Sequence, residues 1–76
     1  SQLPHCILFL KGPTHTIVRS APPCTSLCHV EQMIRDEWKT NETIHMTAHG
    51  RRLSTDNTIA ESNINNGDTI WIQIVA

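Results

Sequence analysis

The pattern of apolar and polar positions is clearest near the end of the chain, where residues 69–75 read TIWIQIV. Successive side chains of a β-strand point to opposite faces, so this alternation predicts a strand with one buried face. The expected buried side carries Ile70, Ile72 and Ile74, and the opposite side carries Thr69, Trp71, Gln73 and Val75. Residues 65–68 read Asn-Asn-Gly-Asp and predict a turn before this strand, in which Gly67 can adopt a positive φ.

Two apolar segments near the start predict a hairpin, with strands at residues 3–11 and 15–20 and a break at Gly12 and Pro13. Both segments are apolar on both faces, so the alternation leaves two pairings open. One pairing buries Cys6, Leu8, Leu10 and Val18, and the other buries Ile7, Phe9 and Ile17. We prefer the first, because its strand members place no histidine or arginine in the core. It leaves Ile7, Phe9 and Ile17 on the open face of the sheet.

A helix is predicted in the middle of the chain, capped by the hydroxyl of Thr25 or Ser26 and ended by residues 39–41. Its apolar stripe, at spacings of three and four residues, consists of Leu27, Val30 and Ile34. Alternation returns at residues 43–48, with Ile44, Met46 and Ala48 on one side. The order strand, strand, helix, strand, short strand, strand is typical of an α+β domain with one helix over one sheet face.

Composition and charge narrow the class of protein. The 76 residues form a single domain, and a net charge of −1 without a basic run argues against nucleic acid as a partner. The longest apolar run, residues 6–10, is too short to span a membrane, and no signal peptide pattern is present. Three cysteines favour free thiols in a reducing compartment. We expect an intracellular monomer, excised from a longer protein because it starts with serine.

One cluster resembles a set of metal ligands: Cys24, Cys28 and His29 lie within six residues. Zinc needs about four ligands, so Cys6 or another histidine would have to complete a site, and free or core cysteines are the favoured alternative. A cysteine nucleophile needs an aligned base, but neighbours on a helix point apart. The short chain also leaves little room for a substrate cleft. We therefore expect no cofactor, no metal and no enzymatic activity.

Trp71 is the strongest candidate for a binding residue. It faces away from Ile70 and Ile72, and therefore away from the face that the helix is expected to cover. An outward tryptophan on an uncovered sheet face is typical of an interface anchor. The alternative is that Trp71 lies flat on its cross-strand neighbours and shields them.

Short motifs in the second half of the chain point to a family. In order, they are Gly50-Arg51-Arg52-Leu53, Asp56-Asn57-Thr58-Ile59, Asn63-Ile64 and Thr69-Ile70. Their order and spacing resemble the second half of ubiquitin, without a gap from about residue 44 to residue 76. The chain is similar to the ubiquitin-like family rather than to ubiquitin itself. The resemblance implies a β-grasp fold: a mixed sheet of about four to five strands with one helix packed on one face, in the order ββαββ with a further strand.

The resemblance also implies a docking surface on the open face of the sheet. Three residues of the apolar patch of ubiquitin correspond by position to Thr47, Trp71 and Gln73, and the turn at residues 11–14 lacks the patch leucine. Most readers of ubiquitin should therefore not recognise this chain. The expected protein-binding site is a different or shifted patch that comprises Trp71, Thr47, Gln73, His45, Arg51, Ile7 and Phe9. The tyrosine that braces the long loop of ubiquitin is replaced by Ser62, so this loop must be held otherwise.

The leading hypothesis is a non-catalytic ubiquitin-like interaction module within a larger protein. Conjugation of a ubiquitin-like protein needs a flexible tail that ends in Gly-Gly, and this sequence stops at Val75 and Ala76, so it cannot be conjugated as given. One alternative is a modifier whose Gly-Gly tail is missing from the sequence. A second alternative is a zinc or redox unit at Cys24 and Cys28.

Overall fold

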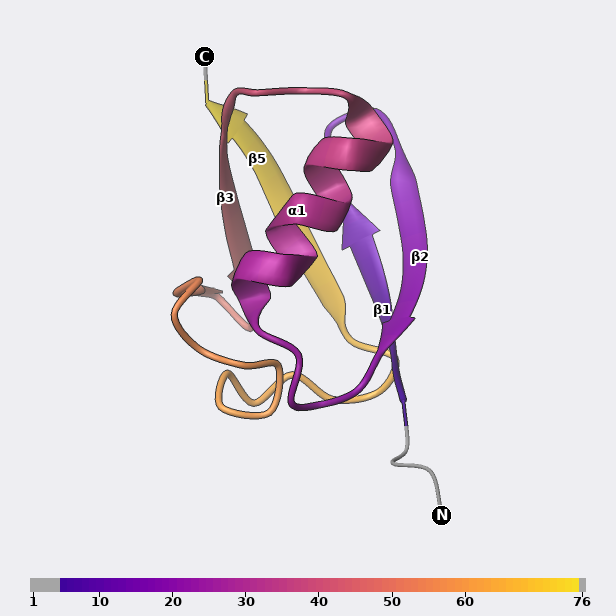
Figure 1. The fold of residues 1–76 in the computed structure, drawn as a ribbon, viewed down its shortest axis with the longest axis vertical. Helices are drawn as coiled ribbons and strands as arrows, with labels where there is room; N and C mark the ends of the chain where they lie inside the picture. The colour runs from indigo at the N-terminus through magenta and orange to yellow at the C-terminus, as the bar shows by residue number, and fades with distance from the viewer. Residues whose placement is uncertain (1–4, 76) are drawn as a thin grey trace.

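A five-stranded mixed sheet with one helix packed across one face forms the domain (Figure 1). The computed structural model describes residues 5–75. The elements are β1 (Cys6–Lys11), β2 (Thr16–Ala21), α1 (Leu27–Trp38), β3 (Thr43–Ala48), β4 (Arg51–Arg52) and β5 (Thr69–Val75). The strand order across the sheet is β2-β1-β5-β3-β4. The neighbours β1 and β5 run parallel, and the other neighbouring pairs are antiparallel. The predicted α+β order is confirmed.

The core lies between α1 and the sheet face that it covers. The predicted helix stripe is fully buried, and so is Ile70, while Ile72 is 5% exposed. The alternations of β3 and β5 are confirmed, since their predicted outward residues are exposed or only half-buried, but Ile74, on the predicted buried side of β5, is itself only half-buried. The buried apolar residues are Cys6, Leu8, Leu10, Ile17, Ala21, Leu27, Val30, Ile34, Ile44, Met46, Ala48, Ile59, Ile64, Ile70 and Ile72.

The first hairpin confirms one half of the preferred pairing and corrects the other half. The β1 members of that pairing are buried, but Val18 is 50% exposed and Ile17 is 7% exposed. The reason is the length of the turn: Lys11 pairs with Thr16, so the turn holds four residues and β2 begins one residue later than predicted. Directly opposite residues of an antiparallel pair share a face. Ile17 therefore joins Leu10 in the core, and Val18 joins Phe9 on the open face.

One predicted part of the hairpin cannot be placed. Residues 3 and 4 of the predicted first strand lie outside the described residues. Within the described part of the chain, β1 begins at Cys6.

Both ends of α1 are held by specific contacts. Ser26 is the N-cap, and its Oγ accepts from the backbone N–H of His29 at 3.2 Å. At the other end Lys39 adopts the left-handed conformation, with φ of 51°, and its N–H donates to the Arg35 carbonyl. The last helical residue, Trp38, lies so close to Gly12 that an added Cβ there would overlap the indole. The end of the helix is thus packed directly against the β1–β2 turn.

The long segment between β4 and β5 is anchored by buried isoleucines and by local hydrogen bonds. Ile59 and Ile64 are buried. Thr58 and Glu61 exchange side-chain to backbone hydrogen bonds of 2.8 and 3.1 Å, the reciprocal pattern of a capping box. These contacts hold the loop. The buried Oγ of Ser62, in the same loop, has no hydrogen-bond partner among the described residues.

The turn before β5 follows the prediction and is tied to the first strand. Gly67 has a φ of 88°, and the Asp68 N–H donates to the Asn65 carbonyl at 3.0 Å. The Ile7 N–H donates to the Asn66 side chain at 2.7 Å, and the Phe9 N–H donates to the Asp68 carbonyl at 3.0 Å. Within the described residues, α1 is too short and too polar to cross a membrane.

Candidate interaction surface: the open face of the sheet

The sheet face opposite α1 collects the exposed apolar side chains. Within the described residues, all five large apolar residues that are exposed belong to the outward sides of β1, β2 and β5. They are Ile7, Phe9, Val18, Trp71 and Val75. Soluble proteins usually scatter exposed apolar residues singly, so their concentration on one face makes this face the candidate interaction surface.

One row of this face crosses all five strands, because successive pairings share a register. The row consists of Thr16, Lys11, Trp71, Thr47 and Arg52. Trp71 stands at its centre with 52% of its surface exposed. The Lys11 ammonium lies over the indole at 4.8 Å from the ring centroid, a cation–π contact. We call these five residues the tryptophan row.

A second row lies beside the tryptophan row and is mostly apolar. Val18 pairs with Phe9, and Phe9 pairs with Thr69. Ile7 lies two residues before Phe9 on the same strand and adds a third apolar side chain at 44% exposure. Val18, Phe9 and Ile7 form what we call the apolar stripe.

Most residues of the predicted site come together on this face. Thr47 pairs with Trp71 in the tryptophan row. His45 pairs with Gln73, two residues further along β5. Gln73 is exposed, whereas His45 and Thr47 are half-buried. The face therefore holds an aromatic centre with a polar flank on β3 and an apolar flank on β1 and β2.

The register corrects one member of the predicted site. Arg51 pairs with Ala48, whose side chain is buried in the core, whereas Arg52 pairs with Thr47. Because directly opposite residues share a face, Arg52 rather than Arg51 belongs to the outward side of the ladder with Trp71. His49 and Gly50 both have positive φ, which closes the β3–β4 hairpin in two residues and fixes this register.

Sequence reasoning missed Val18, Lys11 and Arg52 as members of the surface. The length of the β1–β2 turn is the signal that could have identified Val18. When Lys11 pairs with Thr16, the pairs that follow along the hairpin place Val18 opposite Phe9. The two-residue turn at His49 and Gly50 is the signal that could have identified Arg52. This turn pairs Ala48 with Arg51, so the next pair is Thr47 with Arg52.

The cysteines do not gather into one site. Cys24 and Cys28 are exposed near the start of α1, whereas Cys6 is buried in the core. Across residues 5–75, no three His, Cys, Asp or Glu side chains cluster as a metal site would require.

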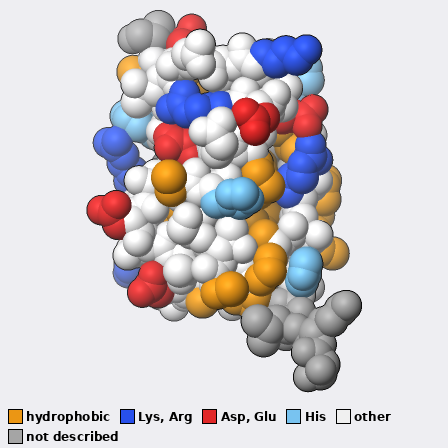
Figure 2. All heavy atoms as spheres, in the orientation of Figure 1, with side chains coloured by type: hydrophobic (Ala, Val, Ile, Leu, Met, Phe, Trp, Pro, Cys, Tyr) orange, Lys and Arg blue, Asp and Glu red, His pale blue; other side chains and the backbone are white. Residues whose placement is uncertain are grey.

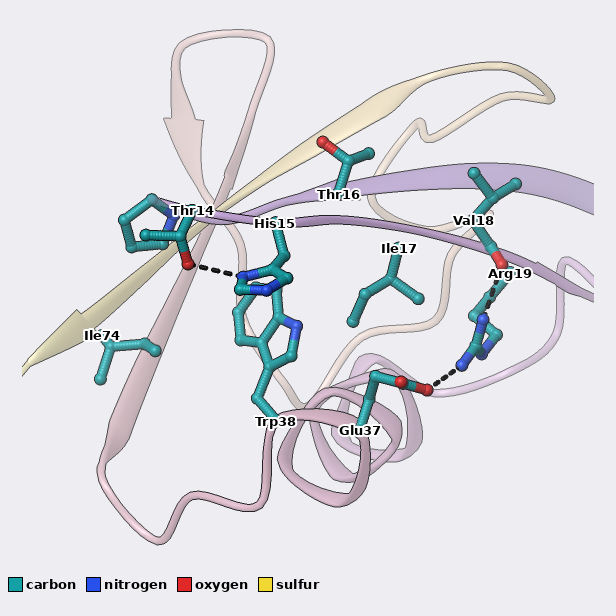
Figure 3. Close-up of a pocket in the computed structure, with 10 residues that line it drawn as sticks. Thr14, His15, Thr16, Ile17, Val18, Arg19, Glu37, Trp38 and Ile74 are labelled. Carbon is teal, nitrogen blue, oxygen red and sulfur yellow. Dashed lines mark hydrogen bonds and ion pairs between the residues drawn. The ribbon is translucent and has the colours of Figure 1, made fainter.

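A hollow lies between β2 and the end of α1, with a volume of about 670 Å³ (Figure 3). Ile17 and Trp38 line it, and an ion pair between Arg19 and Glu37 joins β2 to the helix beside it. The Arg19 guanidinium also donates to the Val18 carbonyl at 2.9 Å. β2 is an edge strand, so Arg19 covers a backbone acceptor at the free edge of the sheet.

Comparison with known proteins shows the fold and not a closer relationship. No protein-family model matches the chain, and no curated protein matches it. Among solved structures, the ubiquitin of Caldiarchaeum subterraneum is similar, with 16% identity, a TM-score of 0.86 and 96% coverage of both chains.

Two further solved structures are domains with the same fold. The N-terminal ubiquitin-like domain of the 4931431F19Rik protein has a TM-score of 0.87 at 12% identity, covering 99% of this chain and 79% of that one. A ubiquitin-like domain from Arabidopsis thaliana has a TM-score of 0.86 at 14% identity, covering 95% and 79%. The chain therefore has the ubiquitin-like β-grasp fold, as its sequence resemblance implied, and is not ubiquitin itself.

Proposed function

We propose that this chain is a non-catalytic interaction domain that binds a protein partner through the open face of its sheet. The observation that carries the proposal is the concentration of exposed apolar side chains on that face. The helix covers the other face, so the same sheet supplies both the core and the binding surface. The chain has the fold of ubiquitin-like domains but lacks the apolar patch of ubiquitin, which points to a different partner.

Trp71 is the expected centre of the interface. Binding hot spots are enriched in tryptophan and lie near the middle of an interface, surrounded by residues that exclude water. Trp71 occupies the middle of its row, with the apolar stripe on one side and Gln73 on the other. Its cation–π contact with Lys11 holds the ring in place, which lowers the entropy lost on binding.

The positions of the exposed cysteines also favour binding over cysteine catalysis. Catalysis by a cysteine requires a base and an orienting group placed around it. Cys28 and His29 are neighbours on α1, so their side chains diverge. The exposed cysteines also lie on a different element from Trp71 and the apolar stripe.

Photo-crosslinking tests which face meets the partner. A benzophenone amino acid at position 18 places the crosslinker on the open face, and the same group in place of Asp36 places it on the exposed outer side of α1. In an extract of the source cells, we expect a discrete adduct from position 18 that disappears when Trp71→Ala is added. Adducts that form only from position 36, or that survive Trp71→Ala unchanged, would contradict the proposal.

A further inference from the structure

We propose that Asn66 is a site of covalent modification, at which the side-chain amide is lost by deamidation through attack of the Gly67 backbone nitrogen. The fold restrains this reaction, because both reacting groups are hydrogen-bonded to Ile7. The inference goes beyond partner binding and does not depend on it. It starts from the sequence of the turn before β5 and from the contacts of that turn with β1.

The Asn66-Gly67 pair brings together the two groups that deamidation requires. In this reaction the backbone nitrogen of the following residue attacks the side-chain carbonyl carbon of asparagine, and a cyclic imide forms. A side chain on the following residue hinders the attack, so glycine, which has no Cβ, permits it best. Each of the other asparagines is followed by a residue with a side chain; they are Asn41, Asn57, Asn63 and Asn65.

The reaction needs only water and hydroxide. The Gly67 nitrogen gives its proton to hydroxide and forms a bond to Asn66 Cγ. The bond from Cγ to Nδ2 then breaks, and ammonia leaves with a proton taken from water, which restores the hydroxide. A second water molecule opens the imide. If the new bond between Cγ and the Gly67 nitrogen is cleaved, the product is aspartate. If the original peptide bond is cleaved, the product is isoaspartate.

In the folded domain, Ile7 binds both reacting groups. The Ile7 N–H donates to Asn66 Oδ1 at 2.7 Å, and the Gly67 N–H donates to the Ile7 carbonyl at 2.7 Å. The first hydrogen bond holds the side-chain carbonyl against β1. The second retains the proton that the Gly67 nitrogen must lose before it can attack. Deamidation therefore requires the turn to separate from Ile7.

This separation does not require the whole domain to unfold. β1 and β5 are paired at three positions, and the first pair joins Phe9 to Thr69. Ile7 lies two residues before that pair, near the start of β1. Contacts at the ends of elements open at a lower free energy than the core does. Asn66 and Gly67 are exposed, so water and hydroxide reach them when the contact opens.

Both products add a carboxylate to a turn that already holds one. Asp68 accepts from the Asn65 N–H at 2.8 Å and pairs with His49 at 2.9 Å. On the helix side of the domain, acidic and basic side chains are interspersed (Figure 2), as in the pair of Glu31 with Arg35. In the turn, His49 is already engaged by Asp68, and the new carboxylate lies two residues away in the sequence, so the two negative charges repel.

Isoaspartate also lengthens the backbone. The main chain then runs through Cγ and gains one methylene group between Asn65 and Gly67. The turn is closed by a hydrogen bond of 3.0 Å from the Asp68 N–H to the Asn65 carbonyl, and the Gly67 N–H connects it to Ile7. The longer chain changes the geometry of both contacts. Deamidation should therefore loosen the attachment of the turn to β1, and the change lasts because the ammonia is lost.

The test compares the folded domain with the same chain unfolded in guanidinium chloride, both kept at mildly alkaline pH. Cleavage after Arg52 by trypsin releases residues 53–76, and mass spectrometry with fragmentation locates any change. We expect a mass gain of about 1 Da at Asn66 and none at Asn63, above the background of a sample that was not incubated. The gain should accumulate at least about tenfold faster in the unfolded chain, where Ile7 no longer restrains the reacting groups.

Variants at Ile7 test the restraint itself. Ile7→Pro removes the N–H that binds Asn66 and should speed deamidation of the folded domain about threefold or more, as expected for one lost hydrogen bond. Ile7→Val keeps that N–H and should react at the rate of the natural sequence. Circular dichroism verifies that both variants fold. If Ile7→Pro fails to fold, guanidinium concentrations below the unfolding transition replace it, and the rate should rise there as the turn opens.

A blocked variant and the isolated product complete the test. In Asn66→Gln, the larger ring forms far more slowly, so position 66 should gain no mass. The deamidated domain separates by ion exchange through its extra negative charge, and NMR should show shifted amide signals for Ile7 and Asp68.

Three results would overturn the proposal. Absence of the gain at Asn66 in the unfolded chain removes the site. Equal rates in the folded and unfolded chains remove the restraint by the fold. An unshifted Ile7 signal in the product removes the loosening of the turn.

Discussion

The two faces of the sheet carry similar apolar side chains but meet different surroundings. On β1, Leu8 and Leu10 are fully buried beneath α1, whereas Ile7 and Phe9, which alternate with them, are 44% and 38% exposed. Residue type does not distinguish the two faces, because both are rich in large apolar groups. The difference is the single helix, which covers one face and leaves the other open in the described part of the chain.

This comparison separates residues that hold the fold from residues that are available for binding. Apolar surface that the helix covers stabilises the domain by about 25 cal/mol for each Å² removed from water. Apolar surface on the open face makes a smaller contribution to folding and is left exposed for the partner that we propose. Substitutions on the two faces should therefore have different effects on stability and binding.

The largest effect is expected from Leu10→Ala on the covered face. Leu10 is fully buried, and truncation leaves a cavity, so the free energy of unfolding should fall by about 2–5 kcal/mol. Urea unfolding followed by circular dichroism measures this loss. The matched variant is Val18→Ala on the open face, which should cost less than about 1 kcal/mol. Equal losses for the two variants would contradict the division between the faces.

A second prediction concerns the contact that fixes the helix over its face. A methyl group at Gly12 would overlap the indole of Trp38, so Gly12→Ala should destabilise the domain by about 1–3 kcal/mol. The control is the same substitution in a Trp38→Leu background, where the smaller side chain leaves space. Thermal unfolding of all four proteins gives the coupling energy, and purely additive losses would show that the overlap is not the cause.

The sequence was sufficient to predict the elements whose alternation is one-sided. β3 has one apolar and one polar side, β5 places its three isoleucines on a single side, and the helix stripe has a single period, so each specifies its buried face. The first hairpin is apolar on both sides, so its pairing depended on the turn length, which alternation does not encode. The exposure of Val18 and the burial of Ile17 follow from that turn.

The candidate surface was predicted only in part, because alternation places Trp71 outward but does not fix its neighbours across the sheet. Trp71 was placed outward because β5 alternates strictly, and its exposure agrees. Its neighbours across the sheet depend on the registers of three other strands. Lys11, Val18 and Arg52 could therefore be assigned to the surface only once those registers were known. The binding role of these residues stays a prediction until a partner is tested.

A third prediction uses pH to loosen the turn that leads into Trp71. The Asn65 backbone N–H and the His49 side chain donate to Asp68 at 2.8 and 2.9 Å, and they lower the pKa of Asp68 from its ordinary value of 3.8. The stabilisation is complete above that ordinary value and is lost as pH falls through the lowered pKa.

Unfolding free energies measured at pH 6 and at successively lower pH values test this contribution. The natural sequence should lose more stability on acidification than Asp68→Asn, which has no carboxylate to protonate. Parallel pH profiles for the two proteins would exclude Asp68 as a source of acid sensitivity. Because the turn also receives hydrogen bonds from β1, the loss should remain smaller than that of Leu10→Ala.

The smallest effect is expected at Ser62, in the long loop between β4 and β5. Its buried hydroxyl has no partner among the described residues, and a buried unsatisfied group carries a desolvation penalty. Ser62→Ala should leave stability unchanged or raise it by up to about 1 kcal/mol, measured by urea unfolding. Thr58→Ala is the contrast, because its hydroxyl accepts from the Glu61 N–H and its loss should destabilise the loop. A marked loss in Ser62→Ala would reveal a hydrogen bond that the hydroxyl makes.

The parallel pairing of β1 with β5 has a mechanical consequence. Within residues 5–75 these are the first and last strands, and they lie side by side in the interior of the sheet (Figure 1). Tension applied through the two ends of the domain pulls the strands past one another along their length. The hydrogen bonds between them then carry the load together, and they must rupture nearly at once rather than open one after another. A domain joined in this way resists stretching more strongly than its thermodynamic stability alone would indicate.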